Sequence, residues 1–200
     1  MIYSFIQSAI TLKKLPRQGW IRVGIPISQI ESIADHSYNT AMLSLLLCDL
    51  HNSLYPENVL DAEIVMRIAI VHDLPECQYQ DFDRQLEHLL GKDKYQEFKG
   101  QVITSASTEL LSLILNEEVK KIWKKSLDGY ATRNSREAKF VSYIDKLEVL
   151  VQALSYEALG YHEVLFDDFW NSSMDYLNNC PFDVINNILT VLKEERATLH

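Results

Sequence analysis

Turn-forming residues are rare in this chain: its 200 residues include only 6 glycines and 5 prolines. A protein built from many short strands needs glycine and proline at its numerous turns, so this scarcity favours long helices. No segment of the sequence alternates apolar and polar residues over a sustained length, and we expect essentially no sheet. The prediction is an all-α fold in which residues 1–200 form one compact domain.

Apolar residues at helical spacing predict where the helices lie, and glycine and proline predict where they end. The predicted helices cover residues 2–13, 29–53, 60–76, 81–90, 93–127 with a break near Asn116, 135–159, 162–178 and 181–197. We expect loops at 15–26 and at Asp128-Gly129, and a C-terminal glycine cap at Gly160. The last two helices, within 162–197, are expected to pack on the core motifs of 15–160.

Charge and cysteine content limit the partners and the compartment. The formal net charge of −9 argues against binding to long nucleic acid, although a small phosphorylated ligand remains compatible with a locally positive site. The three cysteines, Cys48, Cys77 and Cys180, form no CxxC pair, which is typical of free thiols in a reducing compartment. The N-terminus does not resemble a signal peptide and no apolar run is long enough to span a bilayer, so we expect a cytoplasmic protein without a membrane partner.

Residues 68–84, IAIVHDLPECQYQDFDR, place a histidine and several carboxylates directly after an apolar run. On the predicted helix 60–76, each residue turns the helix by about 100°, so His72 and Glu76 would be nearly stacked with Asp73 on the same broad face. Histidine with carboxylate suits a divalent transition metal ion, and a nearby glutamate is an acid/base candidate. Two residues cannot hold such an ion alone, so further ligands are required.

Two further polar residues occupy apolar surroundings. His36 lies on the apolar side of its predicted helix, where it is either a hydrogen-bonded core histidine or a ligand. Asp145 stands within an apolar helical segment, where it needs either an ion pair with Lys139 or Lys146 or a metal ion. A common metal would satisfy both residues together with the His72-Asp73 pair.

The ordered set His36, His72-Asp73 and Asp145 resembles the signature of the HD-domain superfamily of metal-dependent phosphohydrolases. The segments ESIADHS, VHDLPE followed by Asp81, and AKFVSYIDKLEVLVQALSYEALG are similar to its 5′-deoxynucleotidase branch, as is LPRQGW before the first histidine. The similarity runs from about residue 10 to about residue 170. It implies a helical HD domain with a central metal site.

The resemblance also implies a role for each matching residue. It implies four metal ligands, namely His36, His72, Asp73 and Asp145. It implies that Glu76 positions or deprotonates the attacking water, and that Arg17 holds the phosphate and so acts in catalysis together with Asp73. It further implies that Asp81 contacts the sugar hydroxyl and helps to exclude ribonucleotides, and that Trp20 packs near the sugar.

Two departures from the family pattern bear on substrate contacts. Gln80 stands where relatives usually have glycine, which affects how Asp81 can face a sugar. Gln18-Gly19 separates Arg17 from Trp20, whose alternative role is to anchor the loop to the core.

The predicted function is therefore hydrolysis of nucleoside 5′-monophosphates, deoxy forms first, with one Mn, Co, Fe, Ni or Zn ion. The resemblance also implies a homodimer. One alternative is an HD hydrolase of another phosphoester, such as a nucleoside triphosphate or an alarmone. Another is a helical protein that binds nucleotide or metal without turnover.

Overall fold

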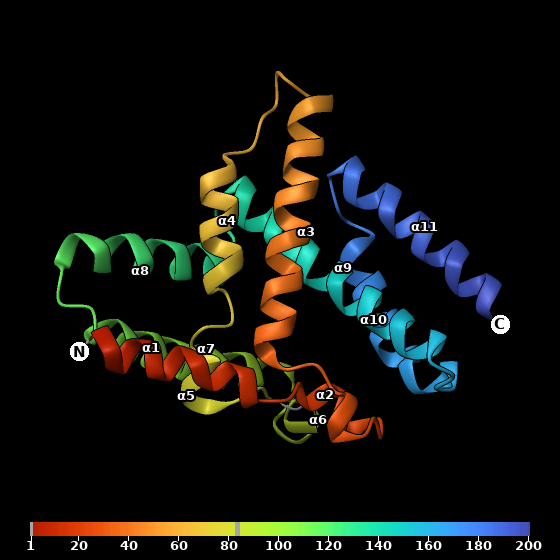
Figure 1. Cartoon of the computed structure of the whole chain (residues 1–200), viewed down its shortest axis with the longest axis horizontal. Coiled ribbons are helices and arrows are strands. Elements are labelled where there is room, and N and C mark those ends of the chain that lie inside the picture. The colour runs from red at the N-terminus through yellow and green to blue at the C-terminus, as the bar shows by residue number, and fades with distance from the viewer. Residues whose placement is uncertain (1, 83–84) are drawn as a thin grey trace. The chain divides into compact units, whose positions relative to one another are not determined.

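The computed structural model describes residues 2–82 and 85–200, and within them every named element is helical (Figure 1). The only β pairing among these residues is an isolated antiparallel bridge between Pro16 and Ser32. The predicted all-α class is confirmed. Among the described helices, none combines the length and the apolar character that crossing a bilayer would require.

The chain divides into two compact units that alternate along the sequence. The first comprises Met1–Tyr38 with Ile70–Ala131, and the second comprises Asn39–Ala69 with Thr132–His200. The chain passes from one unit to the other within helices α3 (Ile33–Leu54) and α4 (Ala62–Val71).

The first unit contains the N-terminal and central helices. Besides the start of α3 and the end of α4, it holds α1 (Ile2–Thr11), η1 (Leu12–Lys14), α2 (Gln18–Arg22), η2 (Ile27–Gln29), α5 (Glu76–Tyr79), α6 (Gln85–Leu90), α7 (Lys92–Ser112) and α8 (Glu117–Thr132).

Among the described residues, the core of the first unit includes an apolar cluster to which α1, η1, α3, α4, α7 and α8 each contribute at least one side chain. Its members include Phe5, Ile33, Val71, Leu110 and Leu127, each at most 7% exposed. Burial of each such side chain stabilises the fold by about 1.5–3 kcal/mol. This cluster fixes the end of α4 against the start of α3, and those two helix ends carry the candidate site.

The second unit is built around the long helix α9 (Arg136–Ala158), with α10 (Asp167–Leu177) and α11 (Asp183–Leu199) packed against it and η3 (Glu163–Phe166) leading into α10 (Figure 1). Ser135 caps the start of α9 by accepting a hydrogen bond from the N–H of Ala138. At its end Gly160 has a φ of 94° and donates to the carbonyl of Glu157, so the predicted glycine cap is confirmed.

The predicted helix 60–76 is wrong in extent, because α4 ends at Val71 and α5 begins at Glu76. Pro75 explains the break: it has no N–H for a helical hydrogen bond, and it disfavours helical geometry in the preceding residue. Residues 72–75 form tight turns instead, in which the N–H of Leu74 reaches the carbonyl of Val71. His72 and Glu76 therefore do not share one helix.

Three other predicted boundaries also need correction. The predicted loop 15–26 contains the short helix α2, and the first long helix of the site begins at Ile33 rather than at residue 29. Asp128-Gly129 lies inside α8, since one glycine costs a helix only about 1 kcal/mol. The break near Asn116 is confirmed. The predicted helix 81–90 falls partly outside the described residues, and α6 covers its second half.

Candidate active site in the first unit

Backbone hydrogen bonds hold the loop that contains Arg17 against the start of α3. Ile33 donates its N–H to the carbonyl of Leu15 at 2.8 Å, and Arg17 donates its own N–H to the carbonyl of Glu31 at 3.2 Å. The indole N–H of Trp20 donates to the Glu31 carboxylate at 2.8 Å, and Trp20 is only 2% exposed. Trp20 therefore ties the loop to the interior, which is the alternative role considered above; its contact with a sugar stays a prediction.

Three candidate ligand atoms meet where α3 begins and α4 ends. Nε2 of His36 lies 3.5 Å from Nε2 of His72, and both lie close to Oδ2 of Asp73, at 3.5 Å and 3.2 Å respectively. Both imidazole side chains are fully buried. The ring of Tyr130 in α8 packs edge-on against His72, with centroids 5.1 Å apart. The predicted ligands His36, His72 and Asp73 thus lie together in the first unit.

The spacing of these atoms fits a shared cation. Ligand atoms about 2.1 Å from one ion at tetrahedral angles lie about 3.4 Å from each other. The three observed separations of 3.2–3.5 Å match this edge length. Two imidazoles with one carboxylate are also a donor set suited to divalent transition ions rather than to Mg²⁺ or Ca²⁺.

Arg17 is a largely buried cation beside this donor set, with 16% of its side chain exposed. Its Nη1 lies 3.5 Å from Oδ2 of Asp73 and 3.8 Å from Oδ2 of Asp81. Burial opposes its charge, yet the nearby carboxylates, led by Asp81 and Asp73, raise the pKa of the guanidinium well above its ordinary value. Burial would raise the pKa of Asp73, but His72, His36 and Arg17 together hold it well below its usual range. Arg17 and Asp73 are therefore a charged pair.

Glu76 begins α5 and is buried, with 7% of its surface exposed. Its Oε2 has no hydrogen-bond partner within the described residues. Burial, followed by the charges of Asp73 and Asp81, raises the pKa of this carboxyl well above its usual range, while Arg17 and Lys99 oppose the rise. A buried carboxyl oxygen without a protein partner is suited to hold a water or a ligand.

Asp81 follows a strained turn at the end of α5. Gln80 has φ 68° and ψ 175°, a backbone conformation that is otherwise almost confined to glycine. Asp81 in turn accepts a hydrogen bond from the N–H of Gln18 at 3.1 Å and pairs with Arg17. Glutamine thus adopts the conformation expected of the family's glycine, and Asp81 faces the loop that carries Arg17.

Asp145 belongs to the second unit. It lies in α9, it is 5% exposed, and its Oδ2 is 2.9 Å from Nζ of Lys146. One of the two ion pairs considered from the sequence is therefore present. Its role as a fourth ligand stays a prediction.

Glu31 is a residue whose place the sequence did not reveal. Its position before Ser32, near a helix start, predicts an N-terminal charge or a cap partner, but Glu31 is only 8% exposed and accepts the indole N–H of Trp20. Its carbonyl also accepts the N–H of Arg17. The only signal in the sequence is that Glu31 is the first residue of the segment ESIADHS, and that position does not predict burial.

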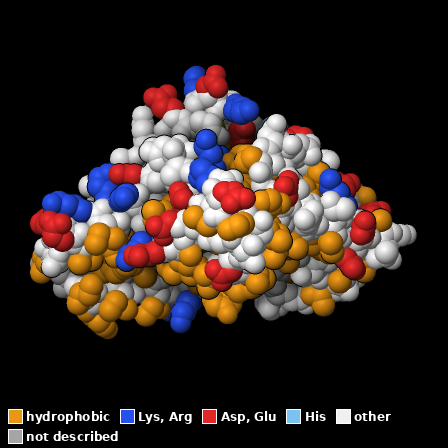
Figure 2. All heavy atoms as spheres, turned by 90° about the horizontal axis from the view of Figure 1, so that it is seen from above, with side chains coloured by type: hydrophobic (Ala, Val, Ile, Leu, Met, Phe, Trp, Pro, Cys, Tyr) orange, Lys and Arg blue, Asp and Glu red, His pale blue; other side chains and the backbone are white. Residues whose placement is uncertain are grey.

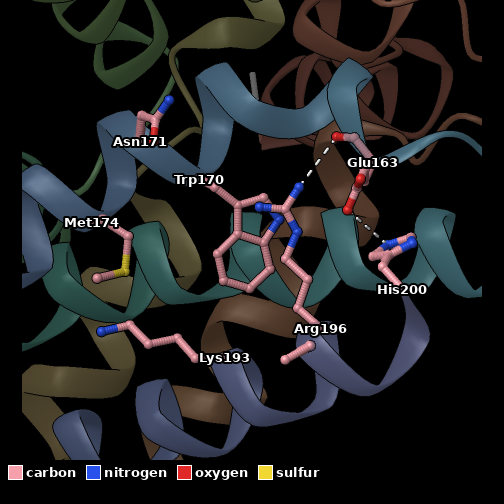
Figure 3. A pocket seen from close by; sticks show the side chains of 8 residues that line it. Glu163, Trp170, Asn171, Met174, Lys193, Arg196 and His200 are labelled. Atoms are coloured by element: carbon pink, nitrogen blue, oxygen red, sulfur yellow. Dashed lines mark hydrogen bonds and ion pairs between the residues drawn. The ribbon is translucent and has the colours of Figure 1, made fainter.

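The second unit has a hollow of its own, of about 350 Å³, lined among others by Trp170, Lys193 and Arg196 (Figure 3). The guanidinium of Arg196 lies over the indole of Trp170, 4.7 Å from the ring centroid. Arg196 also donates to the carboxylates of Glu157 and Asp167, at 3.0 Å each. Because these carboxylates of the same unit neutralise the charge of Arg196, we interpret the arrangement as one that holds α11 to the unit.

Similarity to known proteins agrees with the site. A family model described as "HD domain" matches residues 9–181. The human protein named 5'-deoxynucleotidase HDDC2 is 27% identical over 98% of this chain and 87% of its own length. Its Danio rerio counterpart is 30% identical over 96% of this chain and 86% of its own length. The Schizosaccharomyces pombe protein named 5'-deoxynucleotidase hdd1 is 31% identical over 78% of this chain and 72% of its own length.

Solved structures share the fold. A conserved hypothetical protein from Pyrococcus furiosus superposes with a TM-score of 0.73 at 28% identity, covering 98% of this chain and 99% of the other. An HD-domain phosphohydrolase from Listeria innocua gives a TM-score of 0.72, and at 18% identity over 98% of this chain and 90% of its own it supports the fold alone. The family match covers most of the sequence and includes His36, His72, Asp73 and Asp145. The chain therefore belongs to the HD-domain family.

Proposed function

We propose that the protein is a metal-dependent phosphohydrolase that releases phosphate from nucleoside 5′-monophosphates, with deoxyribonucleotides as the preferred class. The observation that carries this proposal is the position of the Arg17 guanidinium between Asp73, a candidate metal ligand, and Asp81. A largely buried guanidinium there can bind phosphate oxygens with its planar fork while the neighbouring donors hold a cation. The names of the curated relatives support the same substrate class.

His36, His72 and Asp73 would hold one divalent transition ion, which would supply Lewis acidity to the phosphoryl oxygens and favour deprotonation of the attacking water. We propose Asp145 as a fourth ligand. Its support is that Asp145 is a buried carboxylate and lies within the residues that the HD-domain model matches.

The protein's own groups have distinct tasks in this reaction. Arg17 binds the phosphate and offsets the charge that develops on its oxygens. Glu76 orients the water and accepts its proton as the water oxygen bonds to phosphorus. The bond from phosphorus to O5′ then breaks, O5′ takes up the proton that Glu76 accepted, by way of water, and the products are a nucleoside and inorganic phosphate. Asp81 accepts a hydrogen bond from the sugar hydroxyl and sets the position of the sugar.

The test is phosphate release from dAMP, dGMP, TMP and their ribose analogues by metal-stripped protein after addition of Mn²⁺ or Co²⁺. We expect release from the deoxynucleotides that exceeds release from the ribonucleotides and depends on the metal. Asp73→Ala serves as the control, because it removes a candidate ligand. Release no greater than that of this control would rule out the proposal.

We also propose that the protein is a homodimer. An apolar stripe on α3 in the second unit supports this, since its members are each at least 41% exposed; they are Met42, Leu45, Leu46, Leu50 and Leu54. Hydrophobic side chains reach the surface in several places on the face shown in Figure 2. Light scattering on Leu46→Glu should report a monomer where the unmodified protein gives twice the chain mass of 23.1 kDa. A cytoplasmic location stays a prediction.

A further inference from the structure

Three aromatic rings form a continuous group beside Asp81. Tyr79 and Phe82 are stacked, with centroids 4.9 Å apart and planes inclined by 20°. Phe82 meets Phe98 of α7 at 5.7 Å and 65°. We call Tyr79, Phe82 and Phe98 the aromatic group.

The aromatic group does not belong to the apolar cluster that forms the core of the first unit. Phe98 is 41% exposed, and Tyr79 and Phe82 are half-buried. Packing of the core therefore does not account for three rings at this position. Partly exposed aromatic clusters with one polar edge are typical of binding surfaces.

The neighbours of the aromatic group are the groups of the candidate active site. Tyr79 and Phe82 flank Asp81 in sequence, and α7, which carries Phe98, packs against α5. Burial, and then the charges of Glu76, Asp73 and Asp81, raise the pKa of Tyr79. Tyr79 can donate a hydrogen bond through its hydroxyl, and the ring of Phe98 is accessible to a ligand.

The order of these groups follows the order of the parts of a nucleotide. Arg17 pairs with Asp81, and Asp81 adjoins Phe82 and the rest of the aromatic group. A nucleoside 5′-monophosphate presents an anion, then a sugar with hydroxyl groups, then a planar ring. Cation, carboxylate and aromatic rings are the chemical complements of these three parts.

We propose that the aromatic group binds the nucleobase by stacking, so that the enzyme selects nucleotides over sugar phosphates without a base. This inference rests on the proposed function and extends it to the third part of the substrate. Stacking on aromatic side chains tolerates any base, because every base has a π-face. The aromatic group should thus favour nucleotides as a class and discriminate only weakly among bases.

The test compares dAMP with 2-deoxyribose 5-phosphate, which has the same phosphate and sugar but no base. In the unmodified protein, kcat/KM for dAMP should exceed that for the abasic compound by at least tenfold. Phe98→Leu removes the ring and keeps an apolar side chain, and it should lower the ratio of the two kcat/KM values by about tenfold, mainly through KM for dAMP. Phe98→Tyr retains the ring and should keep the ratio within about twofold of the original.

Tyr38→Leu is the matched control, since Tyr38 is an aromatic residue of the first unit that is 71% exposed and lies outside the aromatic group. It should leave the ratio unchanged. An unchanged ratio in Phe98→Leu would overturn the inference, as would a parallel loss for both substrates, which would indicate a displaced Asp81. Melting temperatures of all variants show whether each is folded.

Failure of this inference is separable from failure of the proposed function. If the unmodified protein hydrolyses dAMP and the abasic compound equally well, the phosphohydrolase stands and base stacking is excluded. If it releases phosphate from neither compound with Mn²⁺ or Co²⁺ present, the proposed function itself fails.

Discussion

Arg17 illustrates how a single residue can be held ready for an anion. Its guanidinium is paired with Asp73 and Asp81, so it stays charged although it is largely buried. When a phosphate binds there, its oxygens replace carboxylate oxygens as partners of the guanidinium. The guanidinium is therefore not an isolated charge before the phosphate binds. Buried charges persist in proteins when such partners are present, and the pairs with carboxylates keep the fork in place.

Glu76→Gln separates water activation from metal binding. The amide keeps the shape of the side chain but cannot accept a proton, so kcat for dAMP should fall by about 10²–10⁴. Glu76 provides none of the three ligand atoms that are spaced for a cation, so the metal content measured by elemental analysis should not change. A kcat within a few-fold of the original would remove Glu76 from the proposed chemistry.

The turn after α5 contains a strained residue, Gln80, directly before a candidate site residue, Asp81. Gln80 occupies a conformation that costs a non-glycine residue of the order of 1–3 kcal/mol. Gln80→Gly should relieve part of this strain and raise the free energy of unfolding by about 1 kcal/mol, after the larger chain entropy of glycine is counted. Denaturant titration measures the change.

Gln78→Gly is the matched control for that substitution. Gln78 is an exposed residue of the same short helix α5, where glycine should lower the free energy of unfolding by about 0.5–1 kcal/mol. Opposite signs for two glutamine-to-glycine changes two residues apart would establish that the strain is local. Destabilisation by both would contradict it.

Helix α11 is held to the second unit by a buried charge. The Glu157 side chain is fully buried and accepts hydrogen bonds from Trp170 and Arg196. Arg196→Leu should lower the free energy of unfolding by about 3 kcal/mol, because it leaves a buried carboxylate without its guanidinium. Lys193→Leu, at an exposed residue of the same helix, should change it by less than about 0.5 kcal/mol.

A second substitution tests the cause of that loss. Adding Glu157→Gln to Arg196→Leu keeps an acceptor for Trp170 and removes the unmatched charge, so part of the stability should return. Thermal and denaturant unfolding of the single and double variants give the comparison. No recovery in the double variant would show that packing of Arg196 on Trp170, rather than charge, accounts for the effect.

The helical class was predictable because scarce glycine and proline leave few places to turn. His36 was predictable as an interior residue, since it follows the apolar stripe of its helix, and it is 0% exposed. The break after Val71 does not follow from apolar periodicity, because Ile64, Ile68 and Val71 stay in phase up to the end of α4, and Pro75 is the signal that marks the break. Burial of Glu31 was not predictable, because its partner Trp20 is brought to it by a loop whose path depends on tertiary contacts.

At the scale of the whole molecule, a bound ion should stabilise the fold. If a cation binds only the native chain, stability rises by about 2.7 kcal/mol at a concentration one hundred times its dissociation constant. Adding Mn²⁺ or Co²⁺ to metal-stripped protein should therefore raise the melting temperature measured by calorimetry. Asp73→Asn should abolish the rise, whereas Asp93→Asn, at the exposed start of α7, should retain it. An equal rise in both variants would place the ion elsewhere.

The interleaving of the two units has a consequence for synthesis on the ribosome. His36 leaves the exit tunnel 36 residues before His72, an interval of about two to seven seconds at ordinary elongation rates. The segment Asn39–Ala69 emerges in between. It belongs to the second unit, so its packing can be completed only after Thr132–His200 has been synthesised. A chain released before α8 is synthesised lacks Tyr130, whose ring packs against His72. In such a truncated product the candidate ligand histidines would lack this packing contact.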